Sequence, residues 1–135
     1  MVAVQVHNTL SRKLEAIIPR PGEGQTLSLY TCGPTIYAHA HIGNFRAYVF
    51  EDLLQRHLRE RGFIVRRVMN LTDVDDKTIR GAREAKQKLG DFTQGWTDRF
   101  WRDGQALGLQ KPSKEPRATE FIPKQISLVE KLIQG

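Results

Sequence analysis

A histidine, a glycine and an asparagine stand close together where an expected strand passes through a loop into an expected helix, in residues 30–46. Ligands of open α/β sheets bind at such positions. Gly43 would let a ligand approach the backbone closely, and a helix beginning near Asn44 offers free N–H groups and a positive dipole end to phosphate. His41 and Asn44 are expected to direct donors into one space. The alternative is a surface turn whose polar groups bond to one another.

Cys32, at the end of the same strand, is the only cysteine of the 135 residues. A single cysteine excludes an internal disulfide and a zinc site made of thiolates alone, and it fits a reducing compartment. By itself, a cysteine at a strand end is expected to be a small buried hydrophobic residue. A role in metal binding needs support from other residues.

Four charged residues follow the next expected strand: Asp73, Asp75, Asp76 and Lys77. They allow a metal site or acid–base chemistry. The competing interpretation is structural, because carboxylates in the first turn of a helix complement its dipole. We favour the structural interpretation for these carboxylates.

The expected elements place these residues at the end of a parallel sheet. Alternation from Val2 to Val6 and a second apolar stretch predict a hairpin within residues 1–26. Residues 27–32 and 63–69 read as strands, and apolar residues at helical spacing predict a helix over 44–61, ended by Gly62. Residues 27–70 therefore predict a parallel βαβ unit with a right-handed crossover.

Residues 71–135 are expected to be mainly helical. Thr72 and Asp75 resemble a capping box before a helix over 74–89, which Gly90 would end. A second helix is predicted over 91–107, where aromatic residues at helical spacing would pack in a core. A proline-containing linker over 111–116 precedes a last amphipathic helix over 119–133. These aromatic residues are Trp96, Phe100 and Trp101.

Composition and charge bound the class of protein. A content of 39% hydrophobic residues is typical of one globular domain and excludes a wholly disordered or collagen-like chain. No apolar run is long enough to span a membrane, and no secretory signal is recognised, so we expect a soluble intracellular protein. The net charge of +6 suits a polyanionic partner such as nucleic acid or a nucleotide. Five arginines form a basic cluster, by default a solvated face, with tRNA contact as the alternative: Arg56, Arg59, Arg61, Arg66 and Arg67.

Two parallel strands leave two unpaired sheet edges, so we interpret the chain as the front half of a nucleotide-binding α/β domain. Four blocks then carry a resemblance: CGPTIY at 32–37, HIGN at 41–44, NLTDVDDK at 70–77 and EPRAT at 115–119. In this order they closely resemble cysteinyl-tRNA synthetases, which are class I aminoacyl-tRNA synthetases. The resemblance covers nearly the whole chain. It implies the N-terminal part of a Rossmann-like catalytic domain.

The resemblance implies roles for single residues. His41, Ile42, Gly43 and Asn44 match the motif His-Ile-Gly-His, whose imidazoles stabilise the phosphates of ATP; asparagine at its last position still donates a hydrogen bond but carries no charge. Further implied contacts are Pro34 and Thr35 at ATP, Gly33 and Thr72 at the bound amino acid, and Cys32 as both a Zn²⁺ ligand and a substrate contact. Zinc would select the thiolate of cysteine over the hydroxyl of serine. His39 and His57 are interpreted as ordinary polar positions.

The implied activity is cysteine–tRNA ligation. Cysteine and ATP, with Mg²⁺, would give cysteinyl-adenylate, and tRNA(Cys) would then accept the acyl group. The family's Lys-Met-Ser-Lys-Ser loop has no match in this sequence, and its other zinc ligands lie beyond the matched region, so we expect this chain alone to be inactive. We expect the full-length protein to be cytoplasmic and monomeric. The alternatives are the mycothiol-pathway cysteine ligase and a short, non-catalytic nucleotide- or RNA-binding paralogue.

Overall fold

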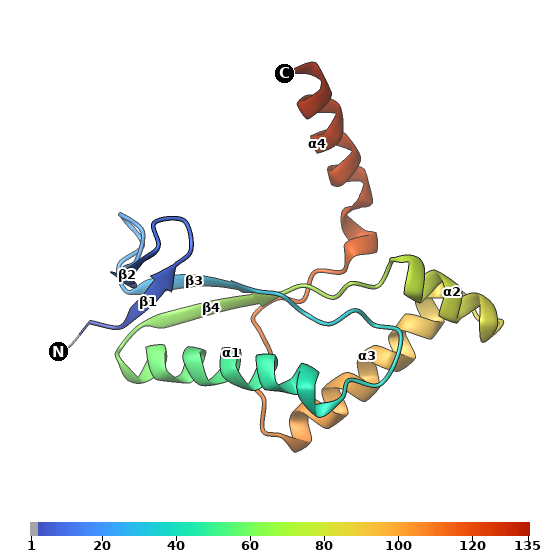
Figure 1. Cartoon of the computed structure of the whole chain (residues 1–135), viewed down its shortest axis with the longest axis horizontal. Helices are drawn as coiled ribbons and strands as arrows, with labels where there is room; N and C mark the ends of the chain where they lie inside the picture. The colour runs from blue at the N-terminus through green and yellow to red at the C-terminus, as the bar shows by residue number, and fades with distance from the viewer. Residues whose placement is uncertain (1–2) are drawn as a thin grey trace.

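The computed structural model describes residues 3–135, so Val2 of the predicted hairpin lies outside the described residues. Antiparallel pairing of the first two strands, with Gln5 opposite Ala16, forms the predicted hairpin. Figure 1 shows the hairpin at one end of the molecule and the helical region at the other. The elements are β1 (Gln5–Asn8), β2 (Lys13–Ala16), β3 (Thr26–Thr31), α1 (Ile42–Glu60), β4 (Ile64–Met69), α2 (Asp76–Glu84), α3 (Leu89–Ala106), a 3-10 helix η1 (Ala118–Phe121) and α4 (Ile122–Gln134).

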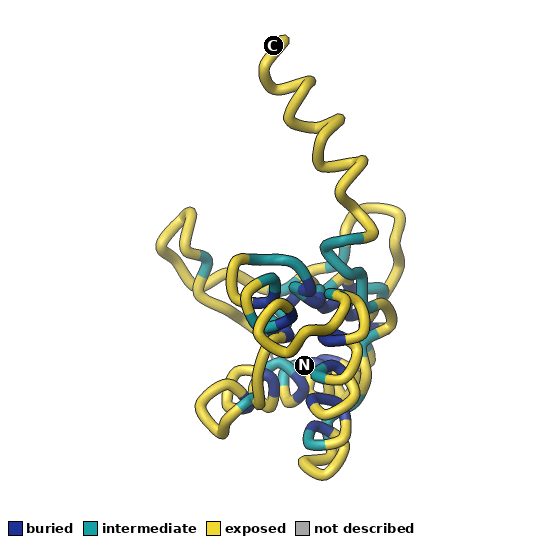
Figure 2. The backbone as a smooth tube through the Cα atoms, turned by 90° about the vertical axis from the view of Figure 1, so that its right-hand side faces the viewer, coloured by how far each residue is buried: buried dark blue, intermediate teal, exposed yellow. Residues whose placement is uncertain are grey.

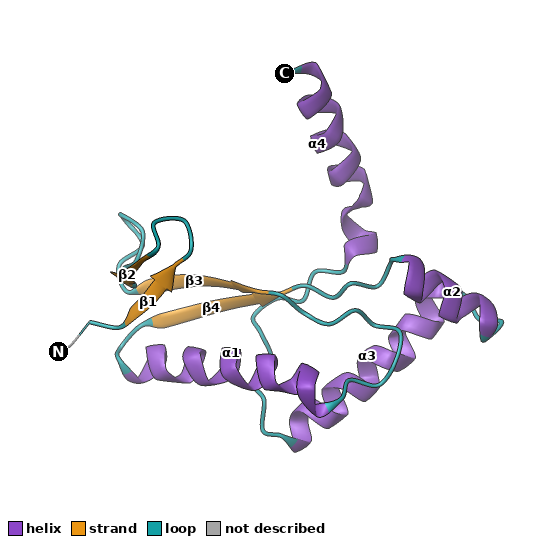
Figure 3. Ribbon diagram, viewed as in Figure 1, coloured by secondary structure: helices purple, strands orange, loops and turns teal. Residues whose placement is uncertain are grey.

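The predicted βαβ unit is confirmed. β3 and β4 run parallel, with Thr26 opposite Ile64 at one end and Thr31 opposite Met69 at the other. α1 lies along one face of this pair (Figure 3). Leu27, Leu58 and Val65 form a buried cluster between α1 and the two strands. Burial of such apolar faces is what drives the crossover helix onto the sheet.

A second core cluster lies at the carboxyl ends of the strands, where α3 packs against α1. The rings of Phe45 and Phe100 stack with centroids 5.4 Å apart, and Tyr48 meets Phe100 edge to face at 5.1 Å. Trp101 is also buried there, and Trp96 packs against the cluster while half-buried. The predicted packing role of these aromatic residues is therefore confirmed. α3 matches the predicted helix closely.

The predicted linker is instead part of the sheet edge. Residues 113–118 run parallel to β4 and its continuation, with isolated bridges at Val68 and Leu71. Four backbone hydrogen bonds of 2.7–3.1 Å join the two segments, among them the N–H of Ser113 donating to the carbonyl of Arg67. The expectation of two unpaired edges is wrong for the β4 edge, because this segment satisfies its backbone groups. Within residues 3–135, β3 pairs only with β4.

α2 is shorter than predicted, and its cap differs. Asp75 is the N-cap, accepting from the N–H of Thr78 at 2.8 Å, while the Thr78 hydroxyl accepts from the N–H of Asp75. The capping box thus begins at Asp75 rather than Thr72. The helix ends at Glu84, and Lys86 then adopts a φ of 53°, which breaks the helical run. Gly90 therefore lies inside α3 instead of ending α2.

The predicted solvated basic cluster is wrong for Arg67, which is buried, whereas Arg56 and Arg59 are exposed as predicted and also bond to other parts of the chain. Arg67 is only 2% exposed and donates to the carbonyl of Gln110. Arg59 donates to the side chain of the same glutamine at 2.6 Å. Arg56 pairs with Asp52 at 2.6 Å and also donates to the carbonyl of Gly108. These arginines hold the turn after α3 against α1 and β4.

The last predicted helix is present as η1 and α4. In Figure 2, α4 is exposed along its length and projects away from the rest of the chain. Its apolar residues include Ile126, Val129 and Leu132, each more than half exposed. None of the described helices has the length and apolar character needed to cross a membrane.

Candidate functional site

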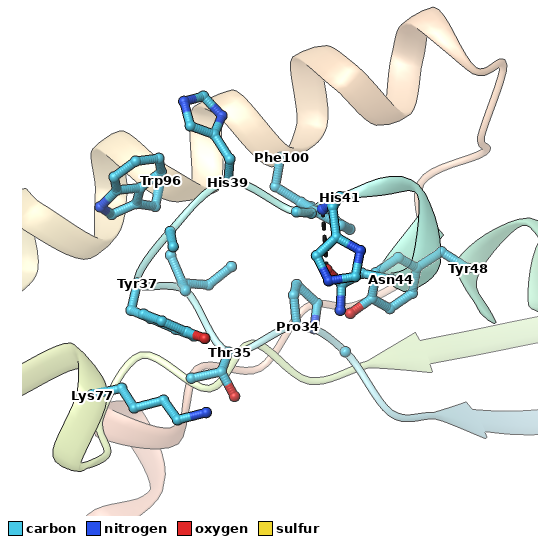
Figure 4. Close-up of a pocket in the computed structure, with 14 residues that line it drawn as sticks. Pro34, Thr35, Tyr37, His39, His41, Asn44, Tyr48, Lys77, Trp96 and Phe100 are labelled. Carbon is cyan, nitrogen blue, oxygen red and sulfur yellow. Dashed lines mark hydrogen bonds between the residues drawn. The ribbon is translucent and has the colours of Figure 1, made fainter. Parts of the chain in front are cut away.

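A pocket of about 350 Å³ opens at the carboxyl ends of β3 and β4 (Figure 4). Its wall is the loop between β3 and α1, closed by the first turns of α1 and α2 and by one face of α3. The crevice beyond the carboxyl ends of parallel strands is where α/β sheets bind ligands. The lining residues are Gly33, Pro34, Thr35, Ile36, Tyr37, Ala38, His39, Ala40, His41, Asn44, Tyr48, Lys77, Trp96 and Phe100.

Five of the predicted site residues line this pocket together: Gly33, Pro34, Thr35, His41 and Asn44. The other four, Cys32, Ile42, Gly43 and Thr72, are not among its lining residues. Cys32, Ile42 and Gly43 are each adjacent in sequence to a lining residue, and Thr72 is bridged to the lining residue Thr35. Ile42 is 78% exposed. The structure therefore brings most of the predicted contacts to one place. Their roles toward a ligand stay predictions.

His41 is the N-cap of α1, so this helix begins two residues earlier than predicted. The imidazole Nδ1 accepts from the N–H of Gly43 at 3.0 Å, and the side-chain oxygen of Asn44 accepts from the N–H of His41 at 3.0 Å. These reciprocal bonds form a capping box from an unusual pair of residues. We expected both side chains to direct donors at a ligand. The structure modifies this expectation, because one acceptor atom of each side chain is used in the cap and only the other polar atom remains for a ligand.

The remaining atoms of both side chains are donors. Since Nδ1 of His41 accepts a hydrogen bond, the neutral ring carries its proton on Nε2. Asn44 uses its oxygen in the cap, which leaves its amide NH₂ group. The first turn of α1 contains no acidic residue. This end of the pocket therefore combines donors with the positive end of a helix dipole, which is an environment for phosphate.

Gly43 has a local structural role besides the predicted one. A Cβ atom at this position would lie 2.8 Å from Cε1 and 3.0 Å from Nδ1 of His41. Glycine therefore leaves room for the imidazole to fold over the first turn of the helix. The predicted close approach of a ligand to this backbone is a separate matter and stays a prediction.

The pocket loop is joined directly to the segment after β4. The N–H of Ile36 donates to the carbonyl of Thr72, and the N–H of Thr72 donates to the carbonyl of Pro34, both at 3.0 Å. Asn70 reinforces this connection: its side-chain oxygen accepts from the N–H of Gly33 at 3.1 Å, and its amide donates to the hydroxyl of Thr72. Thr72 thus positions the pocket wall through its backbone.

Asp73 connects the same segment to the EPRAT block. Its carboxylate is buried and accepts from both the N–H and the hydroxyl of Thr119, at 3.0 and 2.6 Å. Arg117 in that block donates to the side chain of Gln94 on α3 at 2.6 Å. Asp75 therefore has a structural role at the start of α2, as the preferred interpretation predicted, whereas Asp73 has an unpredicted one, because it binds Thr119. The block at 115–119 holds the strand end that carries Thr72.

Tyr48 is a pocket residue that the sequence reasoning missed. It lines the pocket one helical turn beyond Asn44 and is 9% exposed. Burial raises the pKa of Tyr48 to about 12, and the nearby Glu51 and Cys32 act in the same direction. The phenol therefore keeps its proton throughout the neutral range and remains a hydrogen-bond donor. Its spacing of four residues from Asn44 on one helix was the available signal.

Tyr37, His39, Lys77 and Trp96 also line the pocket without having been predicted to do so. His39, interpreted as an ordinary polar position, is exposed, and its ring meets the Trp96 ring edge-on with centroids 4.9 Å apart. Loop position does not reveal which helix a histidine will face. Only the packing of α3 beside the loop brings these two rings together.

Cys32 is exposed, contrary to the buried position that its residue type alone predicts. Among residues 3–135, no three histidine, cysteine, aspartate or glutamate side chains are grouped so that they could hold a metal ion. Zinc in proteins is usually held by three or four protein ligands. The donor set described here therefore fits one ligand of a zinc site and not a complete one.

We expect the purified 135-residue chain to retain far less than one zinc ion per molecule after gel filtration. A single thiol releases zinc readily, because selective binding needs several ligands in fixed geometry. Elemental analysis of the eluted protein measures this, with the Cys32→Ser variant as the matched control. A tight, stoichiometric zinc ion that is lost in the variant would contradict the prediction.

Comparison with known proteins shows the family to which this chain belongs. The profile of the family described as tRNA synthetases class I (C) catalytic domain matches residues 19–135. The chain is 44% identical over 132 residues to the cysteine–tRNA ligase of Protochlamydia amoebophila, covering 98% of this chain and 27% of that protein. With the cysteine–tRNA ligase of Chlamydia muridarum the identity is 47% over 128 residues, covering 95% of this chain and 26% of that protein.

A solved structure is also similar. LeuRS from Agrobacterium radiobacter K84, determined as a ternary complex with tRNA and LeuAMS, matches with a TM-score of 0.58 and 28% sequence identity. The match covers 66% of this chain and 12% of LeuRS. This similarity confirms the predicted α/β fold class of a Rossmann-like half domain. The chain spans about a quarter of the length of the curated relatives named above.

Proposed function

The chain belongs to the family of class I (C) tRNA synthetase catalytic domains, and we propose that the protein that carries it is a cysteine–tRNA ligase. In the proposed reaction, the carboxylate of cysteine attacks the α-phosphate of ATP, giving cysteinyl-adenylate and pyrophosphate. The terminal ribose hydroxyl of tRNA(Cys) then attacks the acyl carbon and releases AMP. Both steps need positioning and stabilisation of phosphate charge, and neither needs a covalent enzyme nucleophile.

The capped N-terminus of α1 is the observation that carries this proposal. His41 supplies an Nε2–H donor and Asn44 an amide donor beside the helix N-terminus, in a pocket without acidic lining residues. Such preorganised donors stabilise the negative charge that develops as pyrophosphate leaves. We place the phosphates of ATP, with Mg²⁺ as part of the substrate, at this end. Pro34, Thr35, Ile42 and Gly43 complete the proposed ATP contacts.

The amino acid is proposed to lie at the strand ends. Gly33 and Thr72 lie where the segments that follow the two strands are hydrogen-bonded to each other, and Gly33 directly follows the exposed Cys32 in the sequence. We propose Cys32 as one ligand of a zinc ion, which when bound would offer the substrate thiolate a soft partner. The other zinc ligands would come from outside the described residues.

Two assays on the full-length protein test the proposal. Cysteine-dependent ATP–pyrophosphate exchange measures adenylate formation, and charging of tRNA(Cys) measures transfer. We expect both activities, with serine giving far less exchange than cysteine. Exchange without tRNA charging would instead support a ligase that joins cysteine to an amino sugar. Absence of exchange would contradict any adenylate-forming function.

We expect the 135-residue chain alone to show no cysteine-dependent exchange. Its sequence contains no Lys-Met-Ser-Lys-Ser loop to complete the ATP site, and it provides one zinc ligand only. The negative charge that develops as pyrophosphate leaves is then only partly stabilised. The measurement is exchange by the purified chain beside the full-length protein at equal concentration. Exchange by the chain above the no-enzyme background would overturn this expectation.

A further inference from the structure

Asn70 directly follows β4, and its side chain takes part in three hydrogen bonds. Its oxygen Oδ1 accepts from the phenol of Tyr30 at 3.0 Å and from the N–H of Gly33 at 3.1 Å. Its amide nitrogen Nδ2 donates to the hydroxyl of Thr72, also at 3.1 Å. One side chain therefore joins the end of β3 to both of the residues that we place at the amino acid, Gly33 and Thr72.

The directions of these bonds are fixed by the backbone. A backbone N–H group can only donate, so the atom of Asn70 that faces Gly33 must be the side-chain oxygen. The NH₂ group of Asn70 then faces Thr72, where it can only donate. Turning the amide over would place two donors against each other at Gly33. The hydroxyl of Thr72 is therefore the acceptor in its bond with Asn70.

This direction leaves Thr72 with a hydrogen to donate. A hydroxyl carries one hydrogen and two lone pairs, and Asn70 occupies one of the lone pairs. Within residues 3–135, the hydroxyl of Thr72 makes no hydrogen bond besides the one from Asn70. Thr72 is half-buried, so a hydrogen without an acceptor there favours a ligand that brings one.

Cysteine carries three polar groups, and only one of them suits this hydrogen. The ammonium group has no lone pair, so it cannot accept. The thiolate is assigned to the zinc ion at Cys32 in the proposed reaction. The carboxylate remains, and it is the group that must be oriented, because one of its oxygens attacks the α-phosphate of ATP. A hydroxyl that donates to the other oxygen would hold the attacking one in place.

We propose that Asn70 is a positioning residue of the ligase reaction, which fixes the hydroxyl of Thr72 as a donor to the carboxylate of the substrate cysteine. The inference rests on the proposed function and deepens it. Asn70 acts through Thr72 and does not itself contact the substrate. Its bond to the Gly33 N–H sets the direction, and its bond to Thr72 passes that direction on.

The variant Asn70→Asp reverses the bond at Thr72 while keeping the shape of the side chain. One carboxylate oxygen still accepts from Gly33, but the other faces Thr72 and takes its hydroxyl hydrogen. The measurements are kcat and the KM values for cysteine and ATP in pyrophosphate exchange by the full-length protein, and the inhibition constant of cysteamine, which is cysteine without its carboxylate. Tyr30→Phe is the matched control, because it removes one bond of Asn70 and leaves the direction set by Gly33 unchanged.

We expect Asn70→Asp to raise KM for cysteine about tenfold, the cost of losing one hydrogen bond to a charged group. KM for ATP and the inhibition constant of cysteamine should not change, and Tyr30→Phe should match the unaltered protein. A variant that is only partly folded would instead lose kcat at unchanged KM. An unchanged KM for cysteine, an equal effect of Tyr30→Phe, or equal weakening of cysteine and cysteamine would each overturn the inference.

The variant Thr72→Val separates the role of the hydroxyl from the charge of the introduced carboxylate. Valine keeps the shape of threonine without its hydroxyl, so KM for cysteine should rise by a similar factor while cysteamine binds as before. Because Asn70 acts through this hydroxyl, adding Asn70→Asp to Thr72→Val should raise KM no further. A second full rise would overturn the inference, since it would assign the effect to repulsion between two carboxylates, and so would an unchanged KM in Thr72→Val. Absence of cysteine-dependent exchange in the unaltered protein would instead contradict the proposed function itself.

Discussion

Replacing His41 by alanine is expected to lower cysteine-dependent ATP–pyrophosphate exchange by the full-length protein at least about 100-fold, the usual cost of removing one preorganised donor to a developing anion. The variant loses the Nε2–H donor and also the cap on the Gly43 N–H. Loss of an N-cap costs about 1 kcal/mol of folding free energy. The exchange rate at saturating ATP and cysteine measures the catalytic part of this effect.

The variant His41→Asn separates the two roles of this side chain. Asparagine is a good N-cap, so thermal unfolding should stay close to that of the unaltered protein. It is too short to place a donor where the imidazole Nε2 lies, so exchange should still fall by a similar factor. If His41→Asn exchanged at the normal rate, His41 would act only as a cap. The proposed phosphate contact would then be wrong.

Replacing Gly33 by alanine is expected to disrupt the site by separating the two strand ends that support the pocket loop. A Cβ atom here would lie 1.7 Å from the backbone oxygen of Asn70 and 3.0 Å from Cγ of Met69. No side-chain rotation relieves a contact with backbone, so the two strand ends must separate. That would break the hydrogen bond from Gly33 to the side chain of Asn70. We expect a loss of about 3 kcal/mol or more in the free energy of unfolding.

Urea denaturation of the 135-residue chain measures this loss, and exchange by the full-length protein reports its effect on the pocket. Gly95→Ala on α3 is the matched control. A Cβ atom at Gly95 meets nothing within 4 Å, and alanine in a helix is favoured over glycine by up to about 1 kcal/mol. The control should therefore be as stable as the unaltered chain or more so. Equal stability of the Gly33 and Gly95 variants would show that the backbones at Gly33 and Asn70 do not pack this closely.

The sequence by itself predicted most of the elements of this protein, and it predicted a ligand site at the strand ends where the pocket lies. Apolar residues at helical spacing marked α1 and α3, and short β-branched runs marked β3 and β4. Such patterns are local, because each element must bury one face of its own. The rule that ligands bind at the carboxyl ends of parallel strands then predicted a site in residues 30–46 that includes His41, and the family resemblance added Gly33 and Thr35. The matched motif blocks indicated the family.

Only the tertiary structure decided which partners the polar side chains take. Arg67 reads as a surface cation until the turn after α3 brings the carbonyl of Gln110 to it. Residues 113–118 read as a linker until their backbone meets the exposed edge of β4. Neither partner is close in sequence, so no local pattern contains this information.

His39 shows the same limit at the site itself. Its neighbour Trp96 lies on another element, and their contact depends on how α3 crosses the pocket loop. Periodicity reports which face of an element is buried, because burial alternates with the element's own repeat. It does not report the angle at which two elements pack. The sequence therefore predicted some of the residues that line the pocket, but the contribution of α3 to its wall depends on packing alone.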